Sequence, residues 1–155
     1  FSGIQDFTAS QIIQYSQKVR EQINKRYPNK FIHPEDSSIK NVTHLLWSGT
    51  PIHEGSDGRN AVFYGDKAID RSPCGTGTSA RLAQLHAKGK LKKGVEFIHE
   101  SFIGSTFVGC IEEETTVGDF PAIIPSIKGW AKIYGYNTII IDDKDDPYAY
   151  GFSVI

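Results

Sequence analysis

The stretch of sequence best able to do chemistry runs from Asp70 to Ala80 and reads Asp-Arg-Ser-Pro-Cys-Gly-Thr-Gly-Thr-Ser-Ala. We expect a strand to end near Ile69 and a helix to begin just after Cys74. The first N–H groups of a helix have no partner inside it and carry the positive end of the helix dipole. The two glycines of the motif let a ligand approach this backbone closely, so the helix start suits a carboxylate or a phosphate.

Two side chains add reactivity to this helix start. The positive field favours the thiolate form of a cysteine placed there, which is the nucleophilic and basic form. Asp70 lies four residues before Cys74, where its carboxylate is placed to pair with a cation. Together they suit a small zwitterion, with its carboxylate on the helix start, its ammonium on Asp70 and its Cα beside Cys74.

Other interpretations of Cys74 stay open at this level. A lone cysteine is often a small buried hydrophobic residue without chemistry. A cysteine hydrolase would instead need a histidine base close to the thiol in space, and nothing in the sequence places one there. The histidines considered for that role are His44, His53, His86 and His99.

The motif closely resembles the second cysteine motif of the proline racemase family, which includes the hydroxyproline 2-epimerases. The resemblance is strong over residues 60–152 and looser in the first helix. It continues downstream in ordered blocks at 85–91, 100–109, 122–125, 135–138 and 146–152.

This resemblance implies an amino-acid racemase or epimerase that needs no cofactor and no metal, with two pseudo-symmetric lobes similar in fold to diaminopimelate epimerase. In such enzymes each lobe carries one cysteine at the start of a central helix. One thiolate removes the Cα proton, and the opposite thiol protonates the other face. By position, Cys74 would be one acid/base, Asp70 would hold the substrate nitrogen, and Gly75 and Thr76 would offer backbone N–H groups to the substrate carboxylate.

One part of the family pattern is absent. The first-lobe motif, of the type Pro-Cys-Gly-His, does not occur, and Cys110 lies in a predicted strand, where we interpret it as structural. We therefore expect residues 1–155 to form a single lobe, the second, with the tail after about residue 130 packing on the missing lobe. That interpretation fits the absence of Met, and the isolated chain is expected to be inactive.

The substrate is expected to be proline or a hydroxyproline. Tyr64 lies ten residues before Cys74, at a position where proline racemases tend to have an aromatic pocket wall, and this favours proline. A tyrosine packed in the core is the alternative interpretation of Tyr64. The alternative functions are a 4-hydroxyproline 2-epimerase, or a lobe that binds an amino acid or carboxylate without turnover.

Local signals predict the elements that position this motif. Thr8 and Gln11 form a capping box that begins a helix, and Gly89 ends a second helix over residues 75–88. Because the second helix has few polar residues, we expect sheet to enclose most of it. The expected fold is α+β, a curled sheet or barrel around the central helix that starts at Cys74. Strands are predicted at 42–47, 60–64, 95–100, 105–113, 122–124, 130–134 and 138–141.

Composition narrows the function classes further. Seventeen Lys and Arg against eighteen Asp and Glu leave a net charge of -1, which argues against a polybasic nucleic-acid binder. No apolar run is long enough for a membrane helix, so we expect no membrane partner and a cytoplasmic protein. The acidic run 142–146 is interpreted as a solvated turn. The expected partners are the amino acid and the missing lobe, and a homodimer of the complete enzyme is left open.

Overall fold

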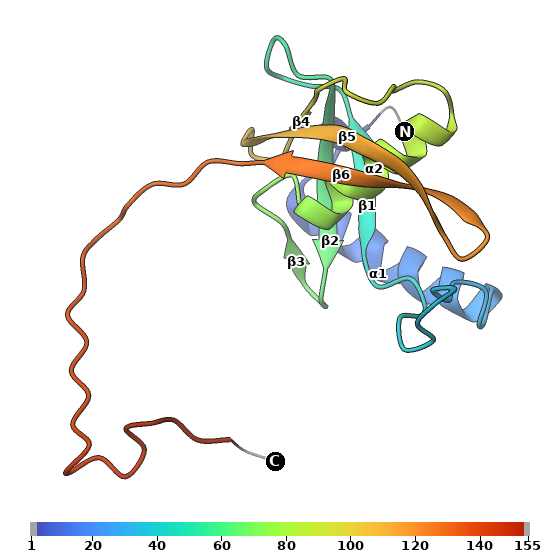
Figure 1. Cartoon of the computed structure of the whole chain (residues 1–155). Helices are drawn as coiled ribbons and strands as arrows, with labels where there is room; N and C mark the ends of the chain where they lie inside the picture. The colour runs from blue at the N-terminus through green and yellow to red at the C-terminus, as the bar shows by residue number, and fades with distance from the viewer. Residues whose placement is uncertain (1–2, 154–155) are drawn as a thin grey trace.

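A computed structural model describes residues 3–153 as a mixed α/β unit followed by an extended tail (Figure 1). Beyond one 3-10 turn, η1 (Ile4–Asp6), this part of the chain contains two helices and six strands. The helices are α1 (Ala9–Arg26) and α2 (Gly75–Ala87). The strands are β1 (Leu45–Gly49), β2 (Gly58–Tyr64), β3 (Ala68–Ile69), β4 (Phe97–Glu100), β5 (Thr106–Val117) and β6 (Phe120–Lys128).

The six strands form one sheet in the order β1-β2-β4-β5-β6, with β3 paired to β2. Only β2 and β4 are parallel, and the chain between them includes α2. The long β5–β6 hairpin passes over α2, while β1 and β2 lie on its other side (Figure 1). The α+β class and the curled sheet around α2 are confirmed. The described residues leave the sheet open, since β1 and β6 end its strand order and do not pair with each other.

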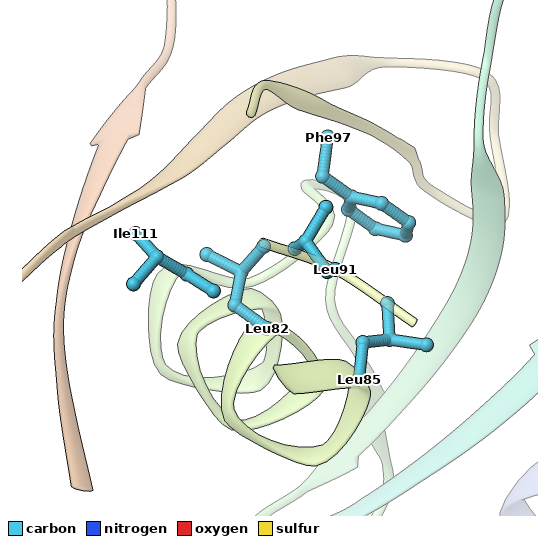
Figure 2. Packing of buried hydrophobic residues seen from close by; sticks show 5 residues of the cluster. All are labelled: Leu82, Leu85, Leu91, Phe97 and Ile111. Carbon is cyan, nitrogen blue, oxygen red and sulfur yellow. The ribbon is translucent and has the colours of Figure 1, made fainter. Parts of the chain in front are cut away.

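A hydrophobic core beneath α2 fixes the helix against the sheet. Leu82 and Leu85 of α2 are buried there with three residues of the sheet and its connections (Figure 2). At Gly109 the backbone of β5 comes so close that an added Cβ would lie 2.9 Å from Leu82 Cδ1. A glycine at this position thus lets strand and helix pack tightly. The other members of the core are Leu91, Phe97 and Ile111.

A second core joins α1 to the sheet. Ile12 of α1 packs there with Ile4 and with Ala61 of β2, and the half-buried Trp47 lies against them. The Trp47 indole donates a hydrogen bond of 2.7 Å to the buried hydroxyl of Ser16 on α1. Two hydrophobic cores therefore hold the sheet in place: one packs it against α2 and the other packs it against α1.

The local helix signals are confirmed. Thr8 Oγ1 accepts from the Gln11 N–H, and the Gln11 side chain accepts from the Thr8 N–H, which is the predicted capping box. Cys74 is the N-cap of α2, and Gly89 follows its last turn with a φ of 64°. Glycine adopts this left-handed conformation without a steric penalty, so it ends the helix as expected.

Three strand predictions and one prediction about α2 are wrong. The first strand begins at Leu45 and not at Val42, because the Asn24 side chain bonds both the N–H and the C=O of Val42, at 2.9 Å each. No strand forms at 130–134 or 138–141, since no strand of the described residues pairs with the tail. The curled sheet does not enclose most of α2: it leaves one helix face uncovered, on which Thr76, Ala80 and Gln84 remain exposed.

Candidate functional site

The thiol of Cys74 lies at the N-terminus of α2. Its Sγ accepts a hydrogen bond from the Gly77 N–H at 3.3 Å and lies 3.3 Å from the Thr76 hydroxyl. Cys74 is only 9% exposed, so the sulfur is largely removed from water. A backbone N–H donor and the positive end of the helix dipole are thus both directed at this sulfur.

The backbone of Cys74 is strained, with φ 65° and ψ 122°. Residues other than glycine rarely adopt a positive φ, and such strain persists only where neighbouring groups impose it. The Cys74 N–H donates to Ser72 Oγ at 3.0 Å, and that hydroxyl donates to Asp70 Oδ1 at 2.9 Å. The Ser72 N–H also reaches Asp70 Oδ1 at 2.9 Å. Asp70 therefore ties the turn that presents the thiol.

The carbonyl of Pro73, just before Cys74, is bound by two buried side chains. Asn60 Nδ2 donates to it at 2.8 Å and Thr78 Oγ1 at 3.3 Å. His99 Nδ1 lies 3.0 Å from Thr78 Oγ1 and 3.3 Å from Asn60 Nδ2. Burial, with a smaller contribution from the charge of Arg81, lowers the pKa of His99 to about 4. The imidazole is therefore neutral at pH 7.

The N–H groups of Gly75 and Thr76 have no acceptor within residues 3–153, unlike the next two N–H groups of the helix. The Gly77 N–H points to Sγ and the Thr78 N–H donates to the Cys74 carbonyl at 2.8 Å. Unpaired N–H groups at a helix N-terminus are a ready site for a carboxylate.

A pocket of about 380 Å³ opens beside this helix start, between α2 and the β1–β2 pair. That volume suits a small molecule. Of the residues predicted to form the site, Cys74 and Thr76 line the pocket, whereas Asp70, Gly75 and Tyr64 do not. The remaining lining residues are His44, Leu46, Ser48, Val62, Gly77, Ala80, Arg81 and Gln84.

Arg81 and Gln84 are pocket residues that the sequence reasoning missed. The guanidinium of Arg81 donates to the Gln84 side chain, which keeps both along one face of α2. A signal was present, since Thr76, Ala80 and Gln84 recur at intervals of four residues and so share one helix face. That face is the one the sheet leaves open.

Tyr64 lies at the end of β2 and is not a core residue. It is 42% exposed, and its ring stacks on that of His44, with centroids 6.4 Å apart and planes 14° apart. Its place in the core, the alternative interpretation from sequence, is therefore wrong. Tyr64 does not line the pocket itself, but it stacks on His44, which does.

Residues 1–153 match the family described as proline racemase. The chain belongs to the proline racemase family. It is 56% identical, over its whole length, to a protein of Spirosoma linguale named 4-hydroxyproline 2-epimerase, and 58% identical over 99% of its length to a 4-hydroxyproline epimerase of Brucella ovis. A hydroxyproline epimerase from Agrobacterium vitis, solved with bound trans-4-hydroxy-L-proline, matches 96% of the chain at 32% identity with a TM-score of 0.74. A probable proline racemase from Agrobacterium radiobacter matches 94% at 36% identity, also with a TM-score of 0.74.

These relatives are about twice as long as the present chain. The chain spans 46% of the Spirosoma protein and 45% of the Brucella protein. It covers 43% and 41% of the two solved chains. The match to the proline racemase family therefore concerns one half of proteins of that length.

A cysteine hydrolase needs a Cys–His hydrogen bond, and the geometry of residues 3–153 does not provide one. His44 lines the same pocket as Cys74, but its Nδ1 lies 2.8 Å from Thr43 Oγ1 and it makes no hydrogen bond to the Cys74 sulfur. Among the described residues, the hydrogen bonds of Cys74 Sγ join Thr76 and Gly77 and no histidine. His99, one of the candidate bases, is buried against Thr78 and Asn60 instead. The other thiol, Cys110, lies in a strand, as the sequence predicted, and not at a helix start. Its partner across the β5–β6 pair is Ser126.

Residues 3–153 contain neither a metal-ligand cluster nor a membrane-spanning helix. No group of three or more His, Cys, Asp or Glu side chains lies close enough together there to hold a metal ion. Neither helix in that range combines the length and the apolar character needed to cross a membrane.

Proposed function

We propose that this chain is the half of an amino-acid racemase or epimerase that supplies one acid/base cysteine, Cys74. The observation that carries the proposal is the position of Sγ at the N-terminus of α2, beside the free N–H groups of Gly75 and Thr76. A thiol and a carboxylate site next to each other are what proton transfer at an amino-acid Cα requires.

In the proposed reaction the substrate carboxylate binds to the helix start, and its Cα lies beside the Cys74 sulfur. The thiolate takes the Cα proton, and a thiol from the other half of the enzyme gives a proton to the opposite face, so that each turnover exchanges the charge states of the two sulfurs. The Cα–H is a very weak acid. Donors aimed at the carboxylate, where negative charge develops, would therefore lower the barrier most.

Asp70 is proposed to bind the substrate nitrogen. Its Oδ1 is already occupied by the Ser72 turn, so the pairing with the ammonium would use Oδ2. In this proposal Asp70 has two tasks: it ties the turn that holds Cys74, and it presents a charge to the substrate.

We further propose that residues 1–155 form one lobe and that the tail packs on the lobe that completes the enzyme. The tail is extended (Figure 1). Many of its large apolar side chains are more than half exposed. Side chains of this kind are normally covered by a partner surface. They include Trp130, Ile133, Tyr134, Tyr136, Ile139, Ile140, Ile141, Tyr148, Tyr150 and Phe152.

The substrate is proposed to be a proline-type imino acid. The names of the relatives point to 4-hydroxyproline, and the aromatic ring of Tyr64 beside the pocket is the feature that favours proline. We place the activity in the cytoplasm, where a pair of catalytic cysteines stays reduced. No cofactor is required for the proposed chemistry, and a homodimer of the complete enzyme is compatible with it.

The decisive experiment compares the native protein that contains this sequence with the isolated 155-residue chain. Chiral chromatography should detect conversion of L-proline or trans-4-hydroxy-L-proline by the native protein, and Cys74→Ser should abolish most of it. The isolated chain should show no turnover, because it lacks the second acid and the orientation of substrate between two groups, which contributes about 7–11 kcal/mol in favourable cases. Carboxylate binding by the native protein without any Cα exchange in deuterated water would instead indicate a binding module.

A further inference from the structure

We propose that Asn60, Thr78 and His99 form a buried clamp on the Pro73 carbonyl, and that this clamp sets the position of the Cys74 sulfur. These three are positioning residues, since none of them lines the pocket. The kinetic part of the test below rests on the proposed function, whereas the hydrogen-exchange part does not.

The clamp is built from three different elements. Asn60 comes from β2, Thr78 from α2 and His99 from β4, and they are 0%, 0% and 1% exposed. They meet around one acceptor, the Pro73 carbonyl, which receives hydrogen bonds of 2.8 Å from Asn60 and 3.3 Å from Thr78. His99 Nδ1 lies 3.3 Å from Asn60 Nδ2 and 3.0 Å from Thr78 Oγ1. The single hydroxyl proton of Thr78 bonds either the Pro73 carbonyl or Nδ1 at any one time, whereas the Asn60 amide has two N–H groups and can bond both.

The clamp acts on Cys74 through the rigid peptide bond between Pro73 and Cys74. The oxygen of this planar unit is bound by Asn60 and Thr78, and its N–H is bound by Ser72 Oγ at 3.0 Å. Because the peptide cannot twist, holding both ends fixes its plane. On the other side of the Cα, the Cys74 carbonyl accepts a hydrogen bond of 2.8 Å from the Thr78 N–H, so the backbone rotation between these two anchored groups is fixed as well. The positive φ of 65° is therefore imposed from outside the residue.

The hydrogen bonds around the Asn60 amide require His99 Nδ1 to be an acceptor. One N–H of the Asn60 amide goes to the Pro73 carbonyl, and the other faces His99 Nδ1 at 3.3 Å. A protonated imidazole would oppose that N–H with a second donor and would disrupt the clamp. Its burial and the nearby charge of Arg81 keep His99 neutral, with a pKa of about 4.

An unpaired atom of Asn60 indicates that the clamp positions the turn at Pro73 in addition to stabilising the fold. In the described structure the side-chain oxygen of Asn60 is buried without a hydrogen-bond partner. Burying an unpaired acceptor is destabilising, and an apolar residue of similar size would avoid it. The NH₂ group accounts for an asparagine at this position, because it contacts both the Pro73 carbonyl and His99 Nδ1.

The test uses the native protein and two pairs of variants. Thr78→Val keeps the shape of the side chain but removes its hydroxyl, whereas Thr78→Ser keeps the hydroxyl. His99→Leu removes the acceptor, whereas His99→Asn keeps a polar atom near the place of Nδ1. Ile111→Ala is the matched control, because it opens the core under α2 without touching Pro73.

Hydrogen exchange measured by mass spectrometry gives the first result. Losing one buried hydrogen bond should raise local opening about tenfold, so Thr78→Val and His99→Leu should speed exchange in residues 72–79 by about that factor more than in residues 83–88. Thr78→Ser and His99→Asn should restore most of the protection. Ile111→Ala should speed exchange along the whole helix.

Turnover of the imino acid gives the second result. A displaced thiol should lower kcat by about tenfold or more while KM changes little, since catalysis depends on the geometry of the reacting atoms. The inference is overturned if Thr78→Val and His99→Leu loosen the helix evenly, as Ile111→Ala does, or leave exchange in 72–79 unchanged. If His99→Leu does not fold, the Thr78 pair decides alone. Failure of the proposed function would appear differently, as no turnover by the unmodified protein.

Discussion

Lowering the pH from 7 to 5 should destabilise this protein through His99. The imidazole is buried, its Nδ1 faces the donors of Asn60 and Thr78, and its pKa in the folded protein is about 4. In the unfolded chain a histidine has a pKa of about 6.5. As the pH falls below that value, the unfolded chain binds a proton that the folded protein does not take up, so stability declines.

The size of the effect follows from these two pKa values. With a folded value of about 4 and an unfolded value of about 6.5, the unfolded state gains roughly 2 kcal/mol at pH 5. The loss is small at pH 7 and levels off only below about pH 4, once the folded protein binds the proton as well. In total it approaches about 3 kcal/mol.

Urea unfolding at pH 7, 6 and 5 measures this loss. Trp47 is a suitable probe, because its indole is half-buried and donates to Ser16 in the folded state. For a slope of about 2 kcal/mol/M, the midpoint should fall by about 1 M between pH 7 and pH 5. His99→Asn, which cannot be protonated, should lose about 2 kcal/mol less over the same interval. His53→Asn, which removes an exposed histidine, should behave like the unmodified protein.

One result would refute the reasoning. If the unmodified protein and His99→Asn lost equal stability between pH 7 and pH 5, His99 would not be the group that titrates. The neutral acceptor in the clamp would then be a wrong assignment.

Three more predictions follow from the site and its supports. Iodoacetamide at neutral pH should modify Cys74 faster than Cys110, because only Cys74 lies at a helix N-terminus; peptide mapping by mass spectrometry tests this, and faster labelling of Cys110 in the folded protein would contradict it. In the complete enzyme Asp70→Asn should weaken substrate binding and turnover while the fold is kept, because an amide oxygen can still accept from Ser72 but carries no charge for the substrate ammonium; an unchanged kcat/KM would make Asp70 purely structural. Thr8→Ala should lower the free energy of unfolding by about 1 kcal/mol, because it removes the capping box. Equal urea midpoints for Thr8→Ala and the unmodified protein would show that the capping box does not contribute to stability.

The sequence alone determined the features that depend on neighbours within one helical turn. The capping box of Thr8 and Gln11, the start of α2 at Cys74 and its end before Gly89 were all predicted correctly. Each of these signals acts between residues at most four positions apart, so no knowledge of the fold is needed to read them. The chemistry of the helix start could be predicted for the same reason.

The strands show where this local information ends. Residues 130–134 and 138–141 carry β-forming side chains, yet no strand forms there. A strand also needs a partner strand for its backbone hydrogen bonds, and none of the described strands pairs with these residues. Val42 is a β-forming residue as well, but its backbone N–H and C=O are hydrogen-bonded to the Asn24 side chain and not to a neighbouring strand. In both cases the deciding group is distant along the chain.

The support of Cys74 was decided only by the tertiary structure. His99 looked in the sequence like one of several possible bases, and Asn60 and Thr78 like ordinary strand and helix residues. The curled sheet brings β2, β4 and α2 together around the Pro73 carbonyl, joining residues up to 39 positions apart. A buried polar atom must find its partner inside the fold, and which atoms are in reach is settled by how the strands and the helix pack, which no local pattern records.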